Sequence, residues 1–430
     1  MTRIILYDVG RFLNRAKAPT PTGIDRVDIR YLQHFLTAPD TKVIGVVQKG
    51  KVLIAVPDRQ FSRLWRLLSA RWIEGLPAVG LEKLDQRWLK LSSSIRTTVM
   101  KLTGRSGASD SALVARSLQR LRHDNPEAEI LYVNSSHNGI KAAAPFRFMR
   151  DTLGAACVFY IHDMIPTDYP DLVRAGAADR HSARMRLVLN AADLVLTNST
   201  YSQDRIAAFA SKEALPLTPI EVLHIGVEPS FLSALKAQGA WSPSETPHFV
   251  TVGTIEPRKN LSVLLKAWKL LKAGPGPTPQ LKIIGRRGWF TEANADYPGL
   301  LEEAAPEAIE TGALDDGQLL EMLLSSRALL FPSFVEGWGM PIVEALTASV
   351  PVIASDIDAF REASQGFATL LPAEDSAAWA NAVRQAASVT PPADLSGFKP
   401  PTWPTHFEKL EQSLGRLRDT FLNNRAGAIR

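Results

Sequence analysis

Short runs of apolar, often β-branched residues alternate along this chain with segments whose apolar residues recur at helical spacing. Ten runs predict buried strands: IILYDV, KVIGVVQ, EILYVN, CVFYIHD, DLVLTNS, IEVLHIGV, HFVTVGT, LKIIGR, ALLFPS and VPVIASD. One helical segment carries its apolar residues at Leu261, Leu264, Leu265, Trp268 and Leu271. This alternation predicts an α/β fold, with parallel sheets covered by helices on both faces.

A polar stretch rich in proline and serine, residues 239–247, separates two such α/β blocks. We therefore expect an N-terminal domain over residues 1–240 and a C-terminal domain over 247–405. Residues 406–430 are predicted to form a final helix that returns to the N-terminal domain. Two doubly wound, Rossmann-like sheets facing each other predict a ligand site between them, at the carboxyl ends of the strands.

Composition adds little to this picture, but it disfavours a membrane-spanning protein. The 430 residues are 45% apolar and 22% charged, as in globular proteins with a sizeable core. No apolar run approaches the roughly 18 residues of a membrane-spanning helix, and we expect the N-terminus to be a core strand, not a signal peptide. The single cysteine, Cys157, suits a reducing cytoplasm.

Positive charge is concentrated in residues 59–105, where ten Lys and Arg face three acidic residues. This excess is larger than the net charge of +5 on the whole chain. Trp65, Trp72 and Trp88 lie among leucines in the same segment. The composition suits either a membrane-surface element or a helical excursion packed on the N-terminal domain. We expect no nucleic-acid partner, because no binding motif accompanies the charge.

The most informative segment is FPSFVEGWGMPIVEAL, which begins as a strand, turns, and enters a helix near Pro341. Gly337 and Gly339 allow close approach of a ligand to the backbone, and a helix start offers free amides to an anion. Glu336 and Glu344 could accept hydrogen bonds from sugar hydroxyls. The alternative is that Glu336 is a helix cap and Glu344 a solvated acid.

A second segment, GTIEPRKN, follows a strand directly and precedes the helix at Leu261. Arg258 and Lys259 therefore lie at a strand-to-helix turn, where two cations beside a helix start can bind a diphosphate. A surface ion pair is the simpler explanation when this segment is taken alone.

Together the two segments resemble family 4 of the retaining glycosyltransferases, which have the two-domain GT-B fold. The family's Glu-x7-Glu signature appears as Glu336 and Glu344, and its Arg-Lys pair as Arg258 and Lys259. Ser349 departs from the family, which usually has glycine there. The resemblance covers residues 249–372.

The resemblance implies a role for each matching residue. Arg258 and Lys259 would bind the donor pyrophosphate. Glu336 would hold hydroxyls of the donor sugar and act in catalysis, and Glu344 would bind the ribose. The remaining donor-binding residues implied are Gly337, Trp338, Gly339 and, beside the base, Leu314.

The N-terminal half resembles the family more loosely. TPTGIDRV would place Gly23 in a loop facing the donor phosphates. YIHDMIPTDYP would place His162 and Asp163 at a strand end near the reacting carbon, as in bacterial mannosyltransferases. A histidine at a strand end is more often a structural residue.

Other strand ends provide acceptor-side candidates, namely Asn134, His137 and Ser199. Asp356 and Asp358 mimic an Asp-x-Asp metal motif, but they follow a C-domain strand and are interpreted as loop residues. No cluster has metal-ligand spacing, so we expect no metal and no cofactor.

The resemblance implies a retaining, metal-independent hexosyltransferase. The donor expected from the mannosyltransferase-like segments is GDP-mannose, and a UDP-sugar is the alternative. The acceptor would be a polysaccharide or a lipid-linked glycan, reached in the cytoplasm, with peripheral membrane contact. A non-catalytic glycan-binding scaffold and a sugar-nucleotide epimerase are the other classes considered. The intact Arg-Lys pair disfavours the first, and the lack of a further pattern of catalytic carboxylates and histidines disfavours the second.

Overall fold

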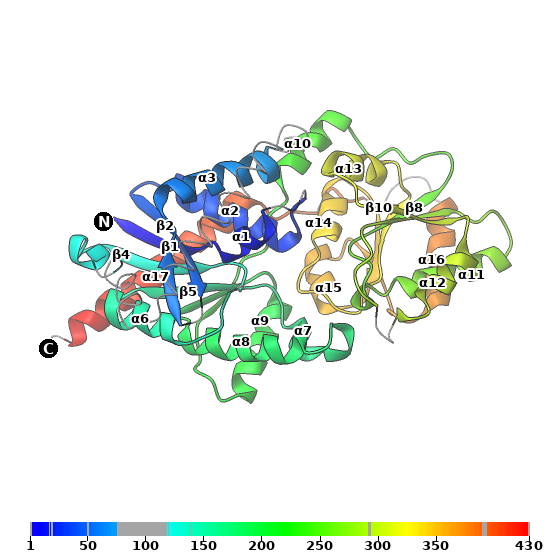
Figure 1. Cartoon of the computed structure of the whole chain (residues 1–430). Helices are drawn as coiled ribbons and strands as arrows, with labels where there is room; N and C mark the ends of the chain where they lie inside the picture. The colour runs from blue at the N-terminus through cyan, green and yellow to red at the C-terminus, as the bar shows by residue number, and fades with distance from the viewer. Residues whose placement is uncertain are drawn as a thin grey trace.

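The structure, a computed structural model, describes residues 2–16, 18, 20–49, 51–74, 118, 120–137, 139–290, 294–388 and 394–428. These residues form two sheets, each covered by helices, which lie side by side (Figure 1). The polar stretch 239–247 lies between them in the chain. The predicted class, two doubly wound α/β sheets, is confirmed.

The first sheet has seven strands in the order β3-β2-β1-β4-β5-β6-β7. Its strands are β1 (Arg3–Asp8), β2 (Thr41–Lys49), β3 (Val52–Ala55), β4 (Glu129–Asn134), β5 (Ala156–Ile161), β6 (Leu194–Thr197) and β7 (Ile220–Val222). Its helices are α1 (Gly10–Arg15), α2 (Gly23–Thr37), α3 (Asp58–Leu68), the π-helix η1 (Ser69–Ile73), α6 (Ala144–Leu153), α7 (Ile165–Asp168), the 3-10 helix η3 (Pro170–Leu172), α8 (Ala177–Ala191), α9 (Thr200–Lys212) and α10 (Pro229–Gln238). All its strand pairs are parallel except β2 with β3.

The second sheet has six parallel strands in the order β10-β9-β8-β11-β12-β13. Its strands are β8 (His248–Val252), β9 (Gln280–Ile284), β10 (Ala308–Gly312), β11 (Ala328–Phe331), β12 (Val352–Ser355) and β13 (Thr369–Leu371). Its helices are the 3-10 helix η4 (Pro257–Lys259), α11 (Leu261–Ala273), α12 (Tyr297–Ala304), α13 (Asp316–Leu324), α14 (Met340–Thr347), α15 (Asp358–Ser364) and α16 (Ser376–Ser388), followed by α17 (Trp403–Ala428).

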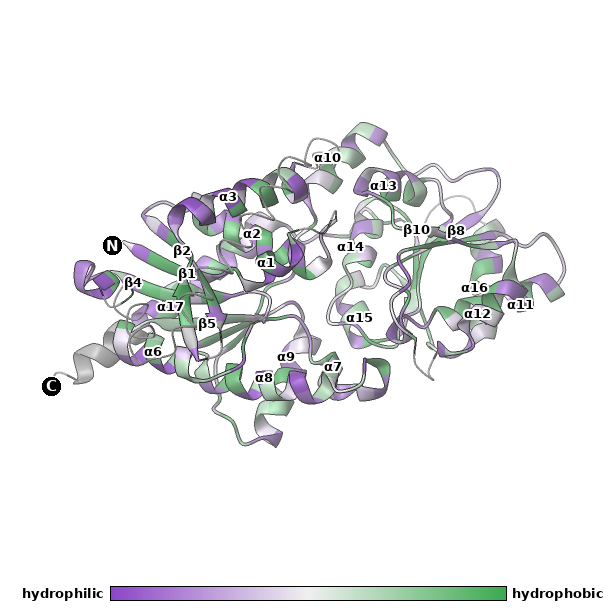
Figure 2. Cartoon of the chain, viewed as in Figure 1, coloured by the Kyte–Doolittle hydropathy of each residue, from purple (hydrophilic) through white to green (hydrophobic). Residues whose placement is uncertain are grey.

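The central strands are apolar without interruption because helices cover both of their faces. All six residues of β5 are buried, as are all four of β11 and all four of β12. Figure 2 shows the same division, with apolar strands inside and polar residues on the outer faces of the helices. This packing leaves the strand ends as the places where polar side chains collect.

The strands that the sequence pattern did not predict, β3, β10 and β13, lie at sheet edges. β10 (AIETG) and β13 (TLL) are only partly buried, and β10 is partly polar, so their apolar signal is weak. The expectation of wholly parallel sheets is corrected by β3, which pairs antiparallel with β2 as a hairpin. The predicted strand IEVLHIGV is also shorter than expected, since β7 ends at Val222.

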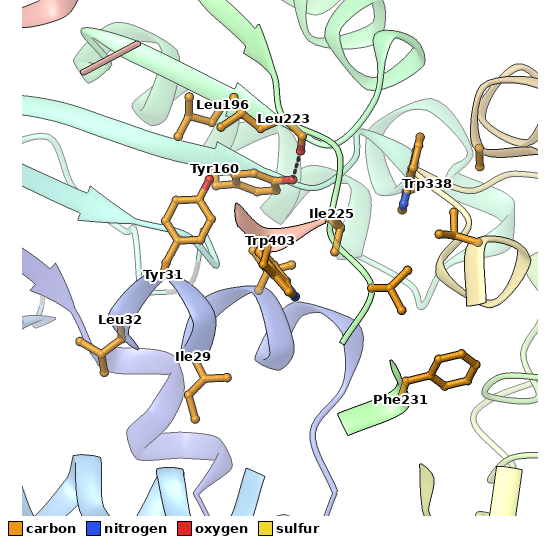
Figure 3. Close-up of a cluster of buried hydrophobic side chains, with 14 of the residues drawn as sticks. Ile29, Tyr31, Leu32, Tyr160, Leu196, Leu223, Ile225, Phe231, Trp338 and Trp403 are labelled. Carbon is orange, nitrogen blue, oxygen red and sulfur yellow. Dashed lines mark hydrogen bonds between the residues drawn. The ribbon is translucent and has the colours of Figure 1, made fainter. Parts of the chain in front are cut away.

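The segment after β7 forms one of two chain crossings between the domains. Gly226 passes so close to the second crossing that a Cβ there would lie 2.3 Å from the Trp403 backbone nitrogen. Glu228 accepts hydrogen bonds from Arg30 at 2.7 Å and from the Trp403 indole at 3.0 Å. Figure 3 shows the buried side chains around these crossings, from Tyr31 and Tyr160 to Trp338.

Helix α17 lies against the first domain, and Figure 1 shows it running behind the strands of the first sheet. His406 Nε2 is 2.9 Å from the Tyr31 hydroxyl, and Arg3 donates to Glu411 at 2.6 Å. The helix begins at Trp403, three residues before the predicted start.

The basic segment 59–105 is described only as far as residue 74, so Trp88 and the rest of its charge lie outside the described residues. Within the described part, Arg59, Arg63 and Arg66 are exposed, whereas Trp72 packs on Phe12 with its ring centroid 6.2 Å away. The described part thus packs on the N-terminal domain. In the described residues, no helix has the length and apolar character needed to cross a bilayer.

Candidate functional site

The predicted phosphate-binding cations lie on η4, immediately after β8, and both contact Glu336. Arg258 Nη1 lies 2.5 Å from Glu336 Oε2, and Lys259 Nζ lies 2.5 Å from Oε1. Ser333 also donates to Oε1, at 3.0 Å. Although burial alone would raise the pKa of Glu336, the charges of Arg258 and Lys259 lower it to about 2. Glu336 is therefore ionised at neutral pH.

Arg258 also contacts Glu256, a residue of GTIEPRKN for which the sequence predicted no role. Arg258 Nε lies 2.5 Å from Glu256 Oε1. Burial lowers the pKa of Arg258, but Glu336 and Glu256 outweigh that effect and raise it. Burial raises the pKa of Glu256 itself, with Arg258 opposing. The guanidinium is thereby fixed in place before any ligand arrives.

Lys259 is almost fully buried and lies over the Phe331 ring, with Nζ 4.6 Å from the ring centroid. Burial lowers the pKa of Lys259, and Glu336 opposes that shift. Gly253, at φ +145°, makes room for this side chain, since a Cβ there would lie 3.1 Å from Lys259 Cε. A small hollow at the end of β8 is lined by Gly253, Lys259 and Ser333.

The Gly337–Gly339 loop before α14 lies directly against the first domain. A Cβ on Gly337 would lie 2.3 Å from the carbonyl oxygen of His162 and 2.9 Å from Asp163 Cβ. Ser199 donates its hydroxyl proton to the Gly337 carbonyl at 2.5 Å, and Ser202 does so at 3.2 Å. The ends of β5 and β6 therefore meet the start of α14.

His162 and Asp163 consequently lie close to the cations of the second domain. His162 Nε2 is 2.8 Å from the Ser135 carbonyl, which can only accept, so Nε2 carries the proton. Burial lowers the pKa of His162 to about 4, which keeps the ring neutral at pH 7. Burial raises the pKa of Asp163, and the Arg258 charge opposes that rise.

Glu344 lies on α14, eight residues after Glu336 of the preceding loop, in a different environment. Burial raises its pKa to about 7, while Arg26 opposes that rise and Asp316 adds to it. Arg26 and Asp316 pair across the domains, with Nη2 to Oδ1 at 2.6 Å. Neither was predicted, although Arg26 follows the helix-capping Thr22 in the TPTGIDRV motif.

The other predicted donor-side residues surround the start of α14. Gly23 begins α2, and a Cβ there would lie 3.2 Å from Met340 Sδ. Trp338 is stacked on His224, with ring centroids 4.7 Å apart. Leu314 is half-buried just before α13. Gly23, Trp338 and Glu344 therefore share one region, while their donor-binding roles remain predictions.

The acceptor-side candidates are more buried than their strand-end positions suggested. Asn134 is fully buried, and its amide donates to the Tyr132 hydroxyl at 3.2 Å and accepts from Ser136 N. Ser199 caps α9 and bonds to Gly337, so it joins the domains. His137 is 7% exposed and lies behind His162, with ring centroids 5.3 Å apart.

The two aspartates that mimic a metal motif have another partner. Arg361 donates to Asp356 at 2.7 Å and to Asp358 at 2.8 Å, on the surface. Among the described residues, no group of three or more His, Cys, Asp or Glu side chains is arranged to hold a metal ion.

Known proteins are similar to this chain in sequence and in fold. Residues 236–391 match the family described as "Glycosyl transferases group 1". Serotype-specific mannosyltransferase WbdA of Escherichia coli is 28% identical over 245 residues, which are 54% of this chain and 29% of that protein. O-antigen chain mannosyltransferase B of Escherichia coli is 29% identical over 266 residues, 56% of this chain and 63% of that protein. The chain thus spans less than two thirds of either relative.

The fold has solved counterparts over its whole length. The structure of sucrose-phosphate synthase from Thermosynechococcus elongatus has a TM-score of 0.57 at 14% identity, covering 98% of this chain and 100% of that one. The predicted resemblance to bacterial mannosyltransferases of the GT-B fold is confirmed by these similarities.

Proposed function

We propose, from the group 1 glycosyl transferase domain at residues 236–391, that this chain transfers a sugar from a nucleoside diphosphate donor to a glycan acceptor. One observation carries the proposal. Arg258, Lys259 and Glu336 form a compact charged group beside the His162–Asp163 turn, which belongs to the other domain. A glycan-binding scaffold has no need for two buried cations at that place.

The proposed chemistry depends on the departure of the diphosphate. Arg258 and Lys259 would bind the phosphates and stabilise the negative charge that develops as the glycosidic bond breaks. Glu336, ionised and held by both cations, would accept hydrogen bonds from hydroxyls of the donor sugar. Glu344 would accept hydrogen bonds from the ribose.

We propose retention of the anomeric configuration, without a metal ion. The acceptor hydroxyl would attack from the face that the diphosphate leaves, and the departing phosphate would take its proton. Neutral His162, whose Nε2–H is already bonded to Ser135, would present its other ring nitrogen to the reacting sugar. Asp163, beside Arg258, would orient the same sugar.

GDP-mannose is the proposed donor, since relatives at 28% and 29% identity are mannosyltransferases. The proposed acceptor is a growing polysaccharide or a lipid-linked glycan, as the O-antigen relative suggests. The reaction would take place in the cytoplasm, where residues 59–105 would bring the enzyme to the membrane surface.

A thermal-shift screen against GDP, UDP and ADP, with and without their sugars, run once with Mg²⁺ and once with EDTA, tests the proposal. A ligand at a hundredfold excess over its Kd stabilises the folded state by about 2.7 kcal/mol. We expect GDP and GDP-mannose to raise Tm, and Arg258→Ala to abolish the rise. Arg287→Ala is the control, because Arg287 is a half-exposed arginine of the same domain paired with Glu310.

Each result has a distinct meaning. Stabilisation by UDP alone would overturn the mannose donor and keep the reaction class. Stabilisation that requires a divalent ion would contradict metal independence. No response to any nucleotide would favour the scaffold.

A further inference from the structure

A cluster of buried polar side chains in the first domain is not used by the proposed reaction. His137 and His181 are 7% and 5% exposed, and their ring centroids are 6.0 Å apart. Arg184, one turn after His181 on α8, is close enough to shift the pKa of both rings. The cluster lies directly behind His162, whose backbone N–H donates to His137 Nε2 at 3.4 Å.

Three atoms of this cluster are buried without a hydrogen-bond partner among the described residues: His137 Nδ1, His181 Nε2 and Arg184 Nε. Since His137 Nε2 accepts a hydrogen bond from the His162 backbone N–H, Nδ1 must carry the ring proton and is a donor. A buried donor without a partner destabilises the fold, because it loses its hydrogen bond to water and gains none in return. Three buried polar atoms without a partner in one place indicate that a polar ligand binds there.

The charge of the cluster is positive and unpaired. Arg180 and Arg184 are spaced i,i+4 on α8, where like charges repel, and neither forms an ion pair within the described chain. Burial lowers the pKa of Arg184, and Arg180 lowers it further. The acid that acts on His181, Asp168, is already bound by Arg205 through two hydrogen bonds, at 2.8 and 3.0 Å.

By contrast, Arg186 on the same helix has a carboxylate partner. It is paired with Glu213 at 2.8 Å and lies on the surface. Among the described arginines of α8, Arg184 is thus the one that lies beside His137 and His181 and has no carboxylate partner.

We propose that His137, His181 and Arg184 bind an oxyanion, a phosphate or a carboxylate, carried by the acceptor glycan. His137 Nδ1–H, the Arg184 guanidinium and, in the tautomer whose Nδ1 accepts from Thr167, His181 Nε2–H suit such a group. The donor diphosphate is assigned to Arg258 and Lys259 on the other domain, so this site lies on the acceptor side of His162. The acceptor assignment rests on the proposed function, whereas anion binding does not.

Titration of the whole chain with inorganic phosphate, and separately with acetate, at constant ionic strength tests anion binding. We expect Arg184→Gln to weaken the binding of one anion about tenfold or more, and Arg186→Gln, with the same change of charge, to leave it unchanged. Equal affinities of the two variants would overturn the site.

Histidine NMR on the wild-type chain provides a second measurement if Arg184→Gln does not fold. The imidazole nitrogens of His137 and His181 are expected to shift on addition of the anion that binds. Unchanged signals at saturating anion would overturn the site.

Kinetics decide whether the anion belongs to the acceptor. Methyl mannoside, its 6-phosphate and methyl glucuronide form a series of neutral, phosphorylated and carboxylated acceptors. We expect Arg184→Gln to raise KM about tenfold for the charged acceptor that is used and to leave the neutral acceptor and the donor KM unchanged. A rise in donor KM instead would overturn the acceptor assignment. If no acceptor is used at all, the proposed function fails, and the phosphate and NMR results still decide whether the site binds anions.

Discussion

At the scale of single residues, two glutamates eight positions apart have opposite pKa shifts. Two cations at 2.5 Å hold the pKa of Glu336 at about 2, against the effect of burial. Burial raises the pKa of Glu344 to about 7, because Arg26 opposes it only in part. Two glutamates of one motif therefore have different pKa values, because their surroundings differ.

Glu344→Gln is expected to stabilise the protein at alkaline pH. A glutamate whose pKa rises from its ordinary value near 4.5 to about 7 holds its proton more tightly when folded, so stability falls as pH rises through that window. The variant should be more stable than wild type by about 1–3 kcal/mol at pH 8 and nearly equal at pH 4, in urea unfolding. Nucleoside diphosphate affinity should fall at the same time.

Glu303→Gln is the control for this experiment, because Glu303 is a half-exposed partner of Lys269. It should show no such dependence on pH. An equal gain at pH 4 and pH 8 for Glu344→Gln would contradict the burial of an ionisable group.

Ser349→Gly should stabilise the fold by about 1 kcal/mol. Ser349 lies at φ +59°, in the left-handed region that glycine adopts without strain, and it stands where the resembling family usually has glycine. Ser62→Gly, inside helix α3, should instead destabilise by about 0.5–1 kcal/mol. Thermal unfolding of both variants checks the pair, and a loss of stability in Ser349→Gly would contradict the strain.

At the scale of elements, the loop before α14 and the ends of β5 and β6 form one unit. The Gly337 carbonyl accepts from Ser199 and Ser202, and the backbone of Gly337 touches that of His162. The turn therefore positions His162 and Glu336 relative to each other, although they belong to different sheets.

Gly337→Ala should destabilise the protein by about 1–3 kcal/mol and reduce turnover, because its Cβ would lie 2.3 Å from a backbone oxygen that cannot move alone. Gly339→Ala is the matched control. Its φ is −169° and its Cβ would meet only side chains, at 3.3 Å. Equal effects of the two substitutions on thermal unfolding would argue against a positioning contact.

At the scale of the whole molecule, polar pairs on two sides of the interface join the domains. Arg26 of α2 binds Asp316 of α13. Glu362 of α15 accepts from Thr200 N at 2.9 Å and lies 2.8 Å from His224 Nε2. The site between these pairs depends on how the two domains are held.

Arg26→Gln should weaken the domain contact by about 1 kcal/mol, which is about a fivefold shift toward separated domains. We expect a larger radius of gyration in small-angle X-ray scattering. Combining it with Asp316→Asn should add little further effect, since the two residues share one interaction.

Arg287→Gln is the control, because it breaks a pair within the second domain, with Glu310 at 2.9 Å. Its radius of gyration should equal that of wild type. Full additivity of Arg26→Gln and Asp316→Asn would show that the pair does not hold the domains together.

The sequence alone determined the α/β class and the two motifs of the second domain. Periodicity reports burial, and the central strands, such as β5 and β11, are buried on both faces. It missed the edge strands β3, β10 and β13, of which β10 and β13 are only partly covered and so lack a continuous buried apolar run. The motif residues could be found because their types and spacing along the chain are visible in the sequence.

Only the tertiary structure decided which residues meet. The pairing of Glu336 with Arg258 and Lys259, the contact of Gly337 with His162, and the unpaired Arg184 beside His137 join segments far apart in sequence. The order of strands and the packing of the two sheets set these distances, and no local pattern of hydrophobic and polar residues contains them. Local sequence specifies the elements, whereas the charges and contacts of the site arise from the way in which those elements pack.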